Sequence, residues 1–236
     1  MTALPRTFQD AATTVQKLGQ RFLWIDKLCI LQDSIADCRK ESALMEKVYS
    51  NSFCNITAWA ANDDTQGFLR HSNPWTGEAI QAEVHGSLFY AFVDEFHSLG
   101  HAVHTRGCLL HERLLSPRSL NFTGSHMSWE CNEAVRSESW PRDYRAAPSA
   151  ATMQRVKRVL NDFNLKHNPE MQKLDTLQEV WCWVVKNYSI RNLTNSKDKP
   201  IAKSAVPRRL SSRLGEYMAG LWKATILYEL LRIGFP

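Results

Sequence analysis

Asp26 is the first residue whose position suggests chemistry. It ends the mostly apolar run 21–26, which is the pattern of a buried strand that delivers a carboxylate to the C-terminal edge of a sheet. In α/β sheets that edge is where ligands bind. An ionised carboxylate at the end of a buried strand needs partners, or its pKa rises. Asp26 is therefore a candidate site residue, and the alternative is an acid that caps the turn after it.

A second candidate site lies at Glu112 and Arg113, near the end of a short predicted helix that stops before Pro117. The pair can bring an acid and a phosphate-binding guanidinium to one edge of the sheet. The alternative is an ion-pair network that holds this helix on the strands that follow it. Arg118 has the same two interpretations.

Histidine and cysteine residues between positions 97 and 111 are of the types that bind zinc. The segment has no paired cysteines and no clear helix to hold its histidines on one face, so we expect solvated loop histidines and no metal site. A nucleophilic role for Cys29 is disfavoured because no histidine is near it in the sequence, and we expect it to pack in the core. The possible zinc ligands are His97, His101, His104, Cys108 and His111.

Composition and charge exclude several classes of protein. The chain has 236 residues, 44% of them apolar and 22% charged, which is typical of a globular protein and not of a disordered, collagen-like or coiled-coil chain. A net charge of +5 is small for a dedicated nucleic-acid binder, and the basic clusters 155–158 and 207–213 lack interleaved aromatic residues. We expect these clusters to be solvated helix faces and expect no nucleic-acid partner.

The cysteine pattern and the apolar segments indicate the cellular compartment of the protein. Six cysteines occur without a C-x-x-C pair, and residues 1–10 contain no secretory stretch, so we expect free thiols in the cytoplasm. The most apolar late segment, 217–233, is interrupted by Lys223, Glu229 and Arg232, which are too costly at the centre of a bilayer. No membrane contact is expected.

The first third of the chain alternates between helix and strand patterns, which favours a parallel sheet with covering helices. Helix starts and stops are marked by capping residues and glycine. The predicted elements are a helix 7–18 capped by Thr7 and stopped by Gly19, a strand 21–26, a helix from Asp33 or Ser34 to Asn51, and a strand 53–60.

The later elements predict a mixed sheet and then a helical region. A strand at 87–93 and a hairpin of 118–122 and 127–131 flank a short helix at 107–115. A stretch rich in proline and alanine at 142–149 has the composition of a linker. Beyond it, helices are predicted at 151–163, 174–188 and 212–231. We therefore expect an α/β domain at 1–140 and a helical region at 141–236 that packs on it.

Three stretches together resemble the fungal heterokaryon-incompatibility (HET) domain. They are LPRTFQDA at 4–11, LWIDKLCILQD at 23–33 and RGCLLHERLLSPR at 106–118. Members of that family usually carry another strand region before the first of these stretches, so we expect an N-terminally truncated chain. This sequence also has Cys108 and His111 where the family usually has tryptophan and glutamine.

The resemblance implies a role in non-self recognition between fungal individuals, in which the domain triggers cell death. The HET domain is thought to be similar in fold to TIR domains, some of which hydrolyse NAD, so the resemblance implies a TIR-like sheet and a possible NAD glycohydrolase with NAD as substrate and no cofactor. It implies partners among other incompatibility proteins or copies of this chain. The alternatives are a non-catalytic signalling or oligomerisation module and an inactive truncated remnant.

The same resemblance assigns roles to individual residues. Glu41 occupies the helix position where TIR-like NADases carry their catalytic acid, although a solvent-facing glutamate is the alternative. Asp26 would orient the ribose or Glu41. From their residue types, and not from the resemblance, Glu112, Arg113 and Arg118 are candidates to contact the nucleotide. We expect Asp26 and Glu41 to meet at the mouth of one pocket.

Overall fold

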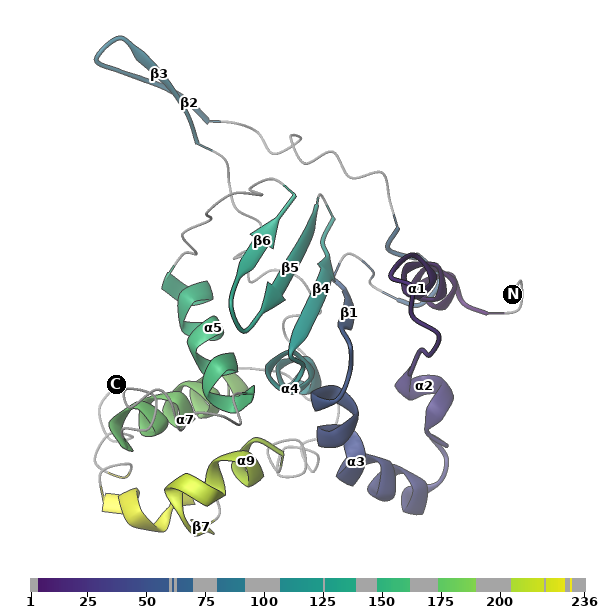
Figure 1. Ribbon diagram of the computed structural model, residues 1–236, viewed down its shortest axis with the longest axis vertical. Coiled ribbons are helices and arrows are strands. Elements are labelled where there is room, and N and C mark those ends of the chain that lie inside the picture. Colours follow the sequence, from purple (N-terminus) through teal and green to yellow (C-terminus); the bar gives the residue numbers. More distant parts are fainter. Residues whose placement is uncertain are drawn as a thin grey trace.

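The computed structural model describes residues 4–59, 61, 63–69, 80–91, 107–124, 126–138, 148–161, 174–189, 205–218, 220–227 and 230. It confirms the predicted mixed α/β class with a helical C-terminal region (Figure 1). The helices are α1 (Arg6–Lys17), α2 (Asp26–Cys29), α3 (Ile35–Ser50), α4 (Gly107–Leu115), α5 (Pro148–Asn161), α7 (Leu174–Ser189), α9 (Ala205–Leu214) and the 3-10 helix η4 (Lys223–Thr225). The strands are β1 (Asn55–Ala58), β2 (Ile80–Val84), β3 (Ser87–Ala91), β4 (Arg118–Phe122), β5 (Met127–Cys131), β6 (Val135–Ser137), β7 (Tyr217–Met218) and β8 (Leu221–Trp222).

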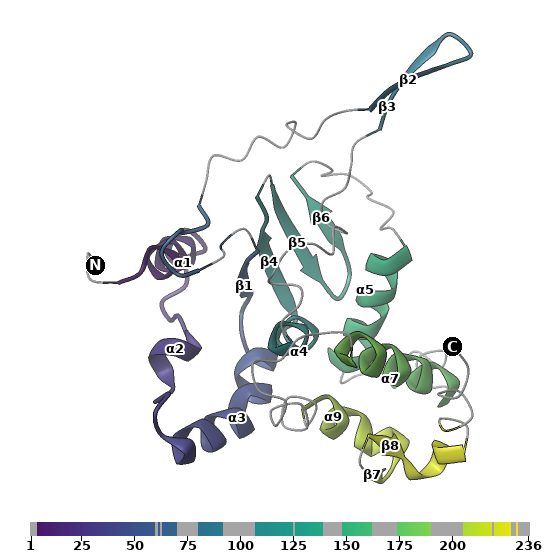
Figure 2. The same cartoon turned by 180° about the vertical axis from the view of Figure 1, so that it is seen from behind.

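The central sheet is mixed, as predicted, and has the strand order β1-β4-β5-β6. Strand β1 runs parallel to β4, whereas β5 runs antiparallel to both of its neighbours, β4 and β6. The hairpin β4–β5 has the predicted bounds. Figure 2 shows the second hairpin, β2–β3, standing away from this sheet, and α7 and α9 at its opposite end.

The two faces of the sheet differ in chemistry because strand residues alternate between them. One face is apolar and packs on α1 through Ala11, with Phe68 and Phe122 in van der Waals contact at a ring-centroid distance of 4.7 Å. The other face carries polar and charged residues that are almost fully buried. These are Thr57, Ser119, Asn121, Ser128 and Glu130.

The main hydrophobic core joins α3 and α4 to the C-terminal helices. Tyr49 of α3 and Leu110 and Leu114 of α4 pack with residues of α5, α7 and α9 in one cluster. The core therefore extends across residue 140, where the sequence pattern placed the boundary between two units. Its other members include Val156, Leu160, Val180, Trp181, Val184, Val206, Leu210, Leu214 and Trp222.

The strand predicted at 21–26 is wrong. Residues 21–25 form no strand, and Asp26 instead opens the short helix α2, in which the Cys29 amide donates to the Ile25 carbonyl at 2.9 Å. A strand requires a neighbour with which to exchange backbone hydrogen bonds, and no described strand pairs with this run. Phe22 of this run is 86% exposed, whereas Trp24 packs against the main hydrophobic core. Cys29, which we expected in the core, is exposed too.

Two predicted helix bounds also need correction. Helix α1 begins at Arg6 after Pro5, and Thr7 is no cap: its amide donates to the Asp64 carbonyl at 3.0 Å. The helix predicted at 212–231 is wrong, because α9 ends at Leu214 and a small β7–β8 hairpin follows. Gly215 and Gly220 there have φ angles of +83° and +110°, which a continuing right-handed helix excludes.

Candidate functional site

Asp26 lies at the start of α2, close to the loop 63–69 that packs on α1. Its Oδ1 atom accepts a hydrogen bond from the Lys27 amide at 2.7 Å. The Lys27 ammonium forms an ion pair with Asp64. That loop is itself held by Asp10 of α1, which accepts from the Phe68 and Leu69 amides at 2.8 and 3.0 Å. The ion pair and these hydrogen bonds together hold the start of α2 in place. The Asp26 carboxylate is exposed at this position.

Glu112 of α4 is near enough to Asp26 for its carboxyl group to experience the Asp26 charge. The pKa of Glu112 is raised to about 7: burial is the largest cause, the negative charge of Asp26 adds to the rise, and a hydrogen bond from the Tyr49 hydroxyl opposes it. Asp26 thus influences Glu112 electrostatically, although the two acids lie far apart in the sequence. Near neutral pH one member of the pair exchanges protons readily, which is the property of a general acid or base.

Helix α3 contributes Tyr49 and Glu41 on one face, because residues four apart along a helix lie above one another. Tyr49 is buried, and its ring meets Trp24 edge to face at 5.9 Å, so it contacts the segment that leads into Asp26. Glu41 lies two turns earlier, roughly 12 Å along the axis. Its side chain is 17% exposed and stands 3.6 Å from the Lys40 ammonium.

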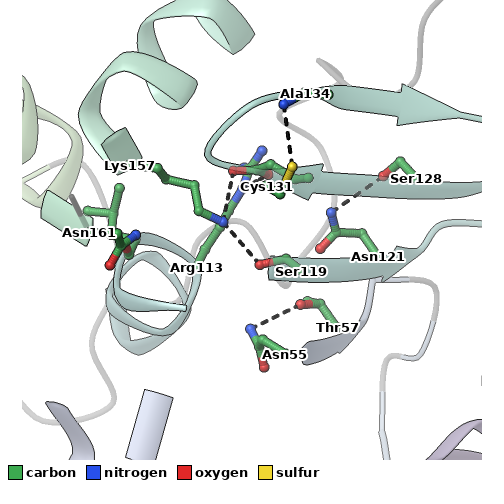
Figure 3. Close-up of polar contacts among 12 residues, drawn as sticks. Asn55, Thr57, Arg113, Ser119, Asn121, Ser128, Cys131, Ala134, Lys157 and Asn161 are labelled. Atoms are coloured by element: carbon green, nitrogen blue, oxygen red, sulfur yellow. Dashed lines mark hydrogen bonds and ion pairs between the residues drawn. The ribbon is translucent and has the colours of Figure 1, made fainter. Parts of the chain in front are cut away.

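Arg113 lies beside Glu112 in the sequence but belongs to a different cluster. Its Nε atom donates to Glu130 Oε2 at 2.7 Å, and its guanidinium lies over the Trp59 ring at 5.3 Å. The second Glu130 oxygen is 3.4 Å from the Lys157 ammonium, which also donates to Ser119 at 3.3 Å. Figure 3 shows Lys157 of α5 and Arg113 of α4 converging on the polar face of the sheet. The interpretation of Arg113 as a partner in an ion-pair network fits these contacts.

Glu130 has the opposite electrostatic surroundings to Glu112. Burial acts to raise the pKa of Glu130, but the charges of Arg113 and Lys157 and their hydrogen bonds outweigh it and lower the pKa. For Lys157, burial lowers the pKa, and the attraction of Glu130 opposes this. The cluster holds one anion and two cations with almost no access to water.

Arg118 at the start of β4 is exposed. Its Nη1 atom donates to the Phe53 carbonyl at 3.3 Å, and its guanidinium lies over the Phe53 ring at 5.5 Å. These contacts tie the start of β4 to the segment before β1. They agree with the interpretation of Arg118 as a residue that holds the fold.

Several residues of these clusters were missed from the sequence. Lys157 was expected on a solvated face and is instead fully buried. In the other basic cluster, Arg209 lies 3.3 Å from Glu46 of α3 and donates to the Leu160 carbonyl at 2.8 Å. The position of Tyr49 could have been predicted, because it lies eight residues after Glu41 on the same helix face. Nothing local marked Lys157 as buried.

No metal site is found among the described residues: they contain no group of three or more histidine, cysteine or acidic side chains placed to bind an ion. His97, His101 and His104 lie outside the described residues. His111 is described, and burial lowers its pKa to about 4, with the nearby Arg208 charge adding to the effect. Its ring meets Tyr188 edge to face at 6.3 Å.

Comparison with known proteins gives one match. The family model described as "Heterokaryon incompatibility protein (HET)" matches residues 1–142, which include both acids of the Asp26–Glu112 pair, Glu41 and Arg113. No curated protein and no solved structure matches the chain. Within the described residues, every helix is too short or too polar to cross a bilayer.

Proposed function

The chain belongs to the heterokaryon incompatibility protein (HET) family, and from this membership we propose that it acts in the cytoplasm as a cell-death effector of fungal non-self recognition. We further propose that it acts by hydrolysing the bond between nicotinamide and ribose in NAD. Similarity of the HET domain to TIR domains supports the choice of NAD as a fold-level analogy. The observation that carries the enzymatic part is the raised pKa of the Glu112 carboxyl group, to which burial and the Asp26 charge both contribute.

Cleavage of this bond places the electron pair on the nicotinamide nitrogen and positive charge on the ribose. An anionic carboxylate beside the ribose stabilises that charge, as in glycoside hydrolysis. In this proposal Glu41 supplies the stabilising carboxylate and Asp26 orients the ribose hydroxyls. Glu112, in its ionised form, accepts the proton of the water that attacks the ribose carbon.

The Glu112 environment supports this assignment in two ways. Its pKa of about 7 lets it accept a proton from water in one step and release it to solvent in the next. The Tyr49 hydrogen bond holds the carboxyl group against the end of α3. Arg113 and Arg118 are given no part in the reaction, because both are engaged in contacts that hold the fold.

A second candidate function is a non-catalytic module that acts by assembly. The exposed apolar side chains around α2 favour it, since isolated apolar residues are ordinary on a surface but a concentration of them marks a contact region. The two candidates differ in whether the purified chain consumes NAD. They do not exclude one another, because clustering can activate an enzyme.

The deciding experiment is incubation of the full chain with NAD and measurement of free nicotinamide by chromatography. We expect release at neutral pH, a loss of about 100-fold or more for Glu112→Gln, and comparable losses for Asp26→Asn and Glu41→Gln. The matched control is Glu133→Gln, which changes an exposed glutamate at the β5–β6 turn and should leave the rate unchanged.

The possible outcomes separate the two candidates. No nicotinamide release at any protein concentration rejects the hydrolase and leaves the assembly module. Release that survives Glu112→Gln and Asp26→Asn rejects the site but keeps the reaction. Equal loss in the Glu133→Gln control would show that the variants act by unfolding.

A further inference from the structure

His111 of α4 takes no part in the proposed reaction, and it lies where α4 meets the C-terminal helices. Leu110 and Leu114, on the same helix, belong to the main hydrophobic core together with Tyr188 of α7 and Leu210 of α9. Figures 1 and 2 both show α4 at one end of the sheet, with α7 and α9 beyond it. The edge-to-face contact between the His111 and Tyr188 rings is therefore part of this junction.

The Nε2 atom of His111 is shielded from water and has no hydrogen-bond partner in the part of the chain that the structure describes. A neutral imidazole can leave its acceptor nitrogen unpaired at a modest cost. An imidazolium cannot, because protonation turns both ring nitrogens into donors and places a full charge where water does not reach it. The folded chain therefore favours the neutral form of His111.

The charged groups described on α3, α5 and α9, which pack against α4, do not offer a free anion to the ring. Arg208 of α9 carries the charge that acts on His111, and it would repel an imidazolium. Glu46 of α3 already lies 3.9 Å from Arg208 and 3.3 Å from Arg209. Lys157 of α5 is a further cation.

The groups described on α7 and on α4 itself are engaged as well. Tyr188 presents an uncharged ring to His111, and Glu179 of α7 pairs with Arg155 of α5 at 3.2 Å. The carboxyl group of Glu112, the next residue on α4, accepts a hydrogen bond from a tyrosine hydroxyl of α3. A proton on His111 would thus add a charge that these neighbours do not neutralise.

We infer that the junction of α4 with α7 and α9 is an acid-sensitive contact, which opens when the His111 imidazole takes up a proton. Opening lets the imidazolium reach water, so proton uptake and opening are linked. The pKa of His111 in the folded chain, about 4, lies below its ordinary value of 6.5. The stabilising contribution of the neutral ring is therefore complete above about pH 6.5 and is lost as the pH falls towards 4.

Hydrogen exchange of the backbone amides of the full chain at pH 7 and pH 5 tests the inference. On going to pH 5, we expect the α9 amides of the wild type to lose about 20-fold more protection than those of His111→Gln, which has no ionisable ring. Amides of the β4–β5 hairpin should keep their protection, because the hairpin lies outside the junction.

The matched control is His85→Asn, which replaces an exposed histidine between β2 and β3 and should behave like the wild type. Asparagine suits this position because it tolerates the φ angle of 53° found there. A histidine that is simply lost from the chain is thereby distinguished from one that is lost from the junction.

Three exchange results would overturn the inference. They are an equal loss of α9 protection in the wild type and His111→Gln, an equal change in the His85→Asn control, and an equal loss of protection in the β4–β5 hairpin, which indicates global unfolding. NMR titration of the His111 ring in the wild type decides the case even where the variant does not fold. A pKa well below 6.5 supports the inference, and a pKa of 6.5 or above overturns it.

The inference goes beyond the NAD reaction and does not depend on it. Exchange and titration are measured without nucleotide, so a chain that releases no nicotinamide can still show the acid-sensitive junction. The two proposals therefore fail separately.

Discussion

Two glutamates on neighbouring parts of the fold, Glu112 and Glu130, are both withdrawn from water but have opposite neighbours. Glu130 lies between Arg113 and Lys157, and its pKa is lowered. The pKa of Glu112 is raised to about 7 by burial, and the negative charge of Asp26 adds to the rise. Burial alone acts the same way on both carboxyl groups, so the charge of the nearest partner decides the difference. Glu130 is therefore held in a fixed ion pair, whereas Glu112 keeps a proton available for transfer.

The largest expected effect comes from breaking the Glu130 cluster. Glu130→Gln should lower the free energy of unfolding by about 3–5 kcal/mol, because it leaves Arg113 and Lys157 buried without an anion. Lys157→Met should lower the free energy of unfolding far less. Glu130 then keeps its ion pair with Arg113, and the cost of burying the Lys157 ammonium is removed. Urea unfolding monitored by fluorescence measures both. Equal costs for the two variants would show that the cluster is not the electrostatic unit described here.

The second prediction concerns the pH dependence caused by Glu112. Its folded-state pKa of about 7 is above the ordinary value of 4.5, so its stabilising contribution is present below about pH 4.5 and is lost as pH rises through 7. The Glu112→Gln variant has no carboxyl group at this position, so it does not lose this stability as the pH rises. The variant should therefore gain about 3 kcal/mol of stability over the wild type between about pH 4.5 and pH 8. A stability difference that does not change across this range would contradict the raised pKa.

The smallest effect should come from Tyr49→Phe, which removes the hydroxyl that donates to Glu112. That hydrogen bond favours the ionised carboxylate, so its loss should raise the Glu112 pKa and cost about 1 kcal/mol of stability. Carbon-13 NMR titration of the glutamate carboxyl signals measures the first effect. A Glu112 pKa that is unchanged or lower in the variant would remove Tyr49 from the site.

Elements defined by local interactions could be predicted from the sequence. Ser34 is a good cap, and α3 starts after it and ends at Asn51 as predicted. The hairpin β4–β5 is defined by the alternation of its strands and a short polar connection, and it also has the predicted bounds. The apolar run at 21–26 looked equally clear, yet strand formation depends on a partner elsewhere in the chain.

Only part of the candidate site could be predicted from the sequence. Asp26, Glu41 and Glu112 were all selected from the sequence, but the effect of the Asp26 charge on Glu112 was not, because it depends on how the folded chain places α2 and α4. Arg113 and Lys157 have the same charge and similar patterns as exposed basic residues. Their burial follows from the packing of α4 and α5 on the polar face of the sheet.

The amino-acid sequence by itself determined the family, the α/β class and the helices and hairpin whose signals are local: caps, glycines and hydrophobic periodicity act within a few residues. Tertiary structure alone decided which acids meet, which cations are buried and which apolar residues stay outside. These outcomes depend on long-range packing and on electrostatic interactions that act across space, and no short stretch of sequence contains them.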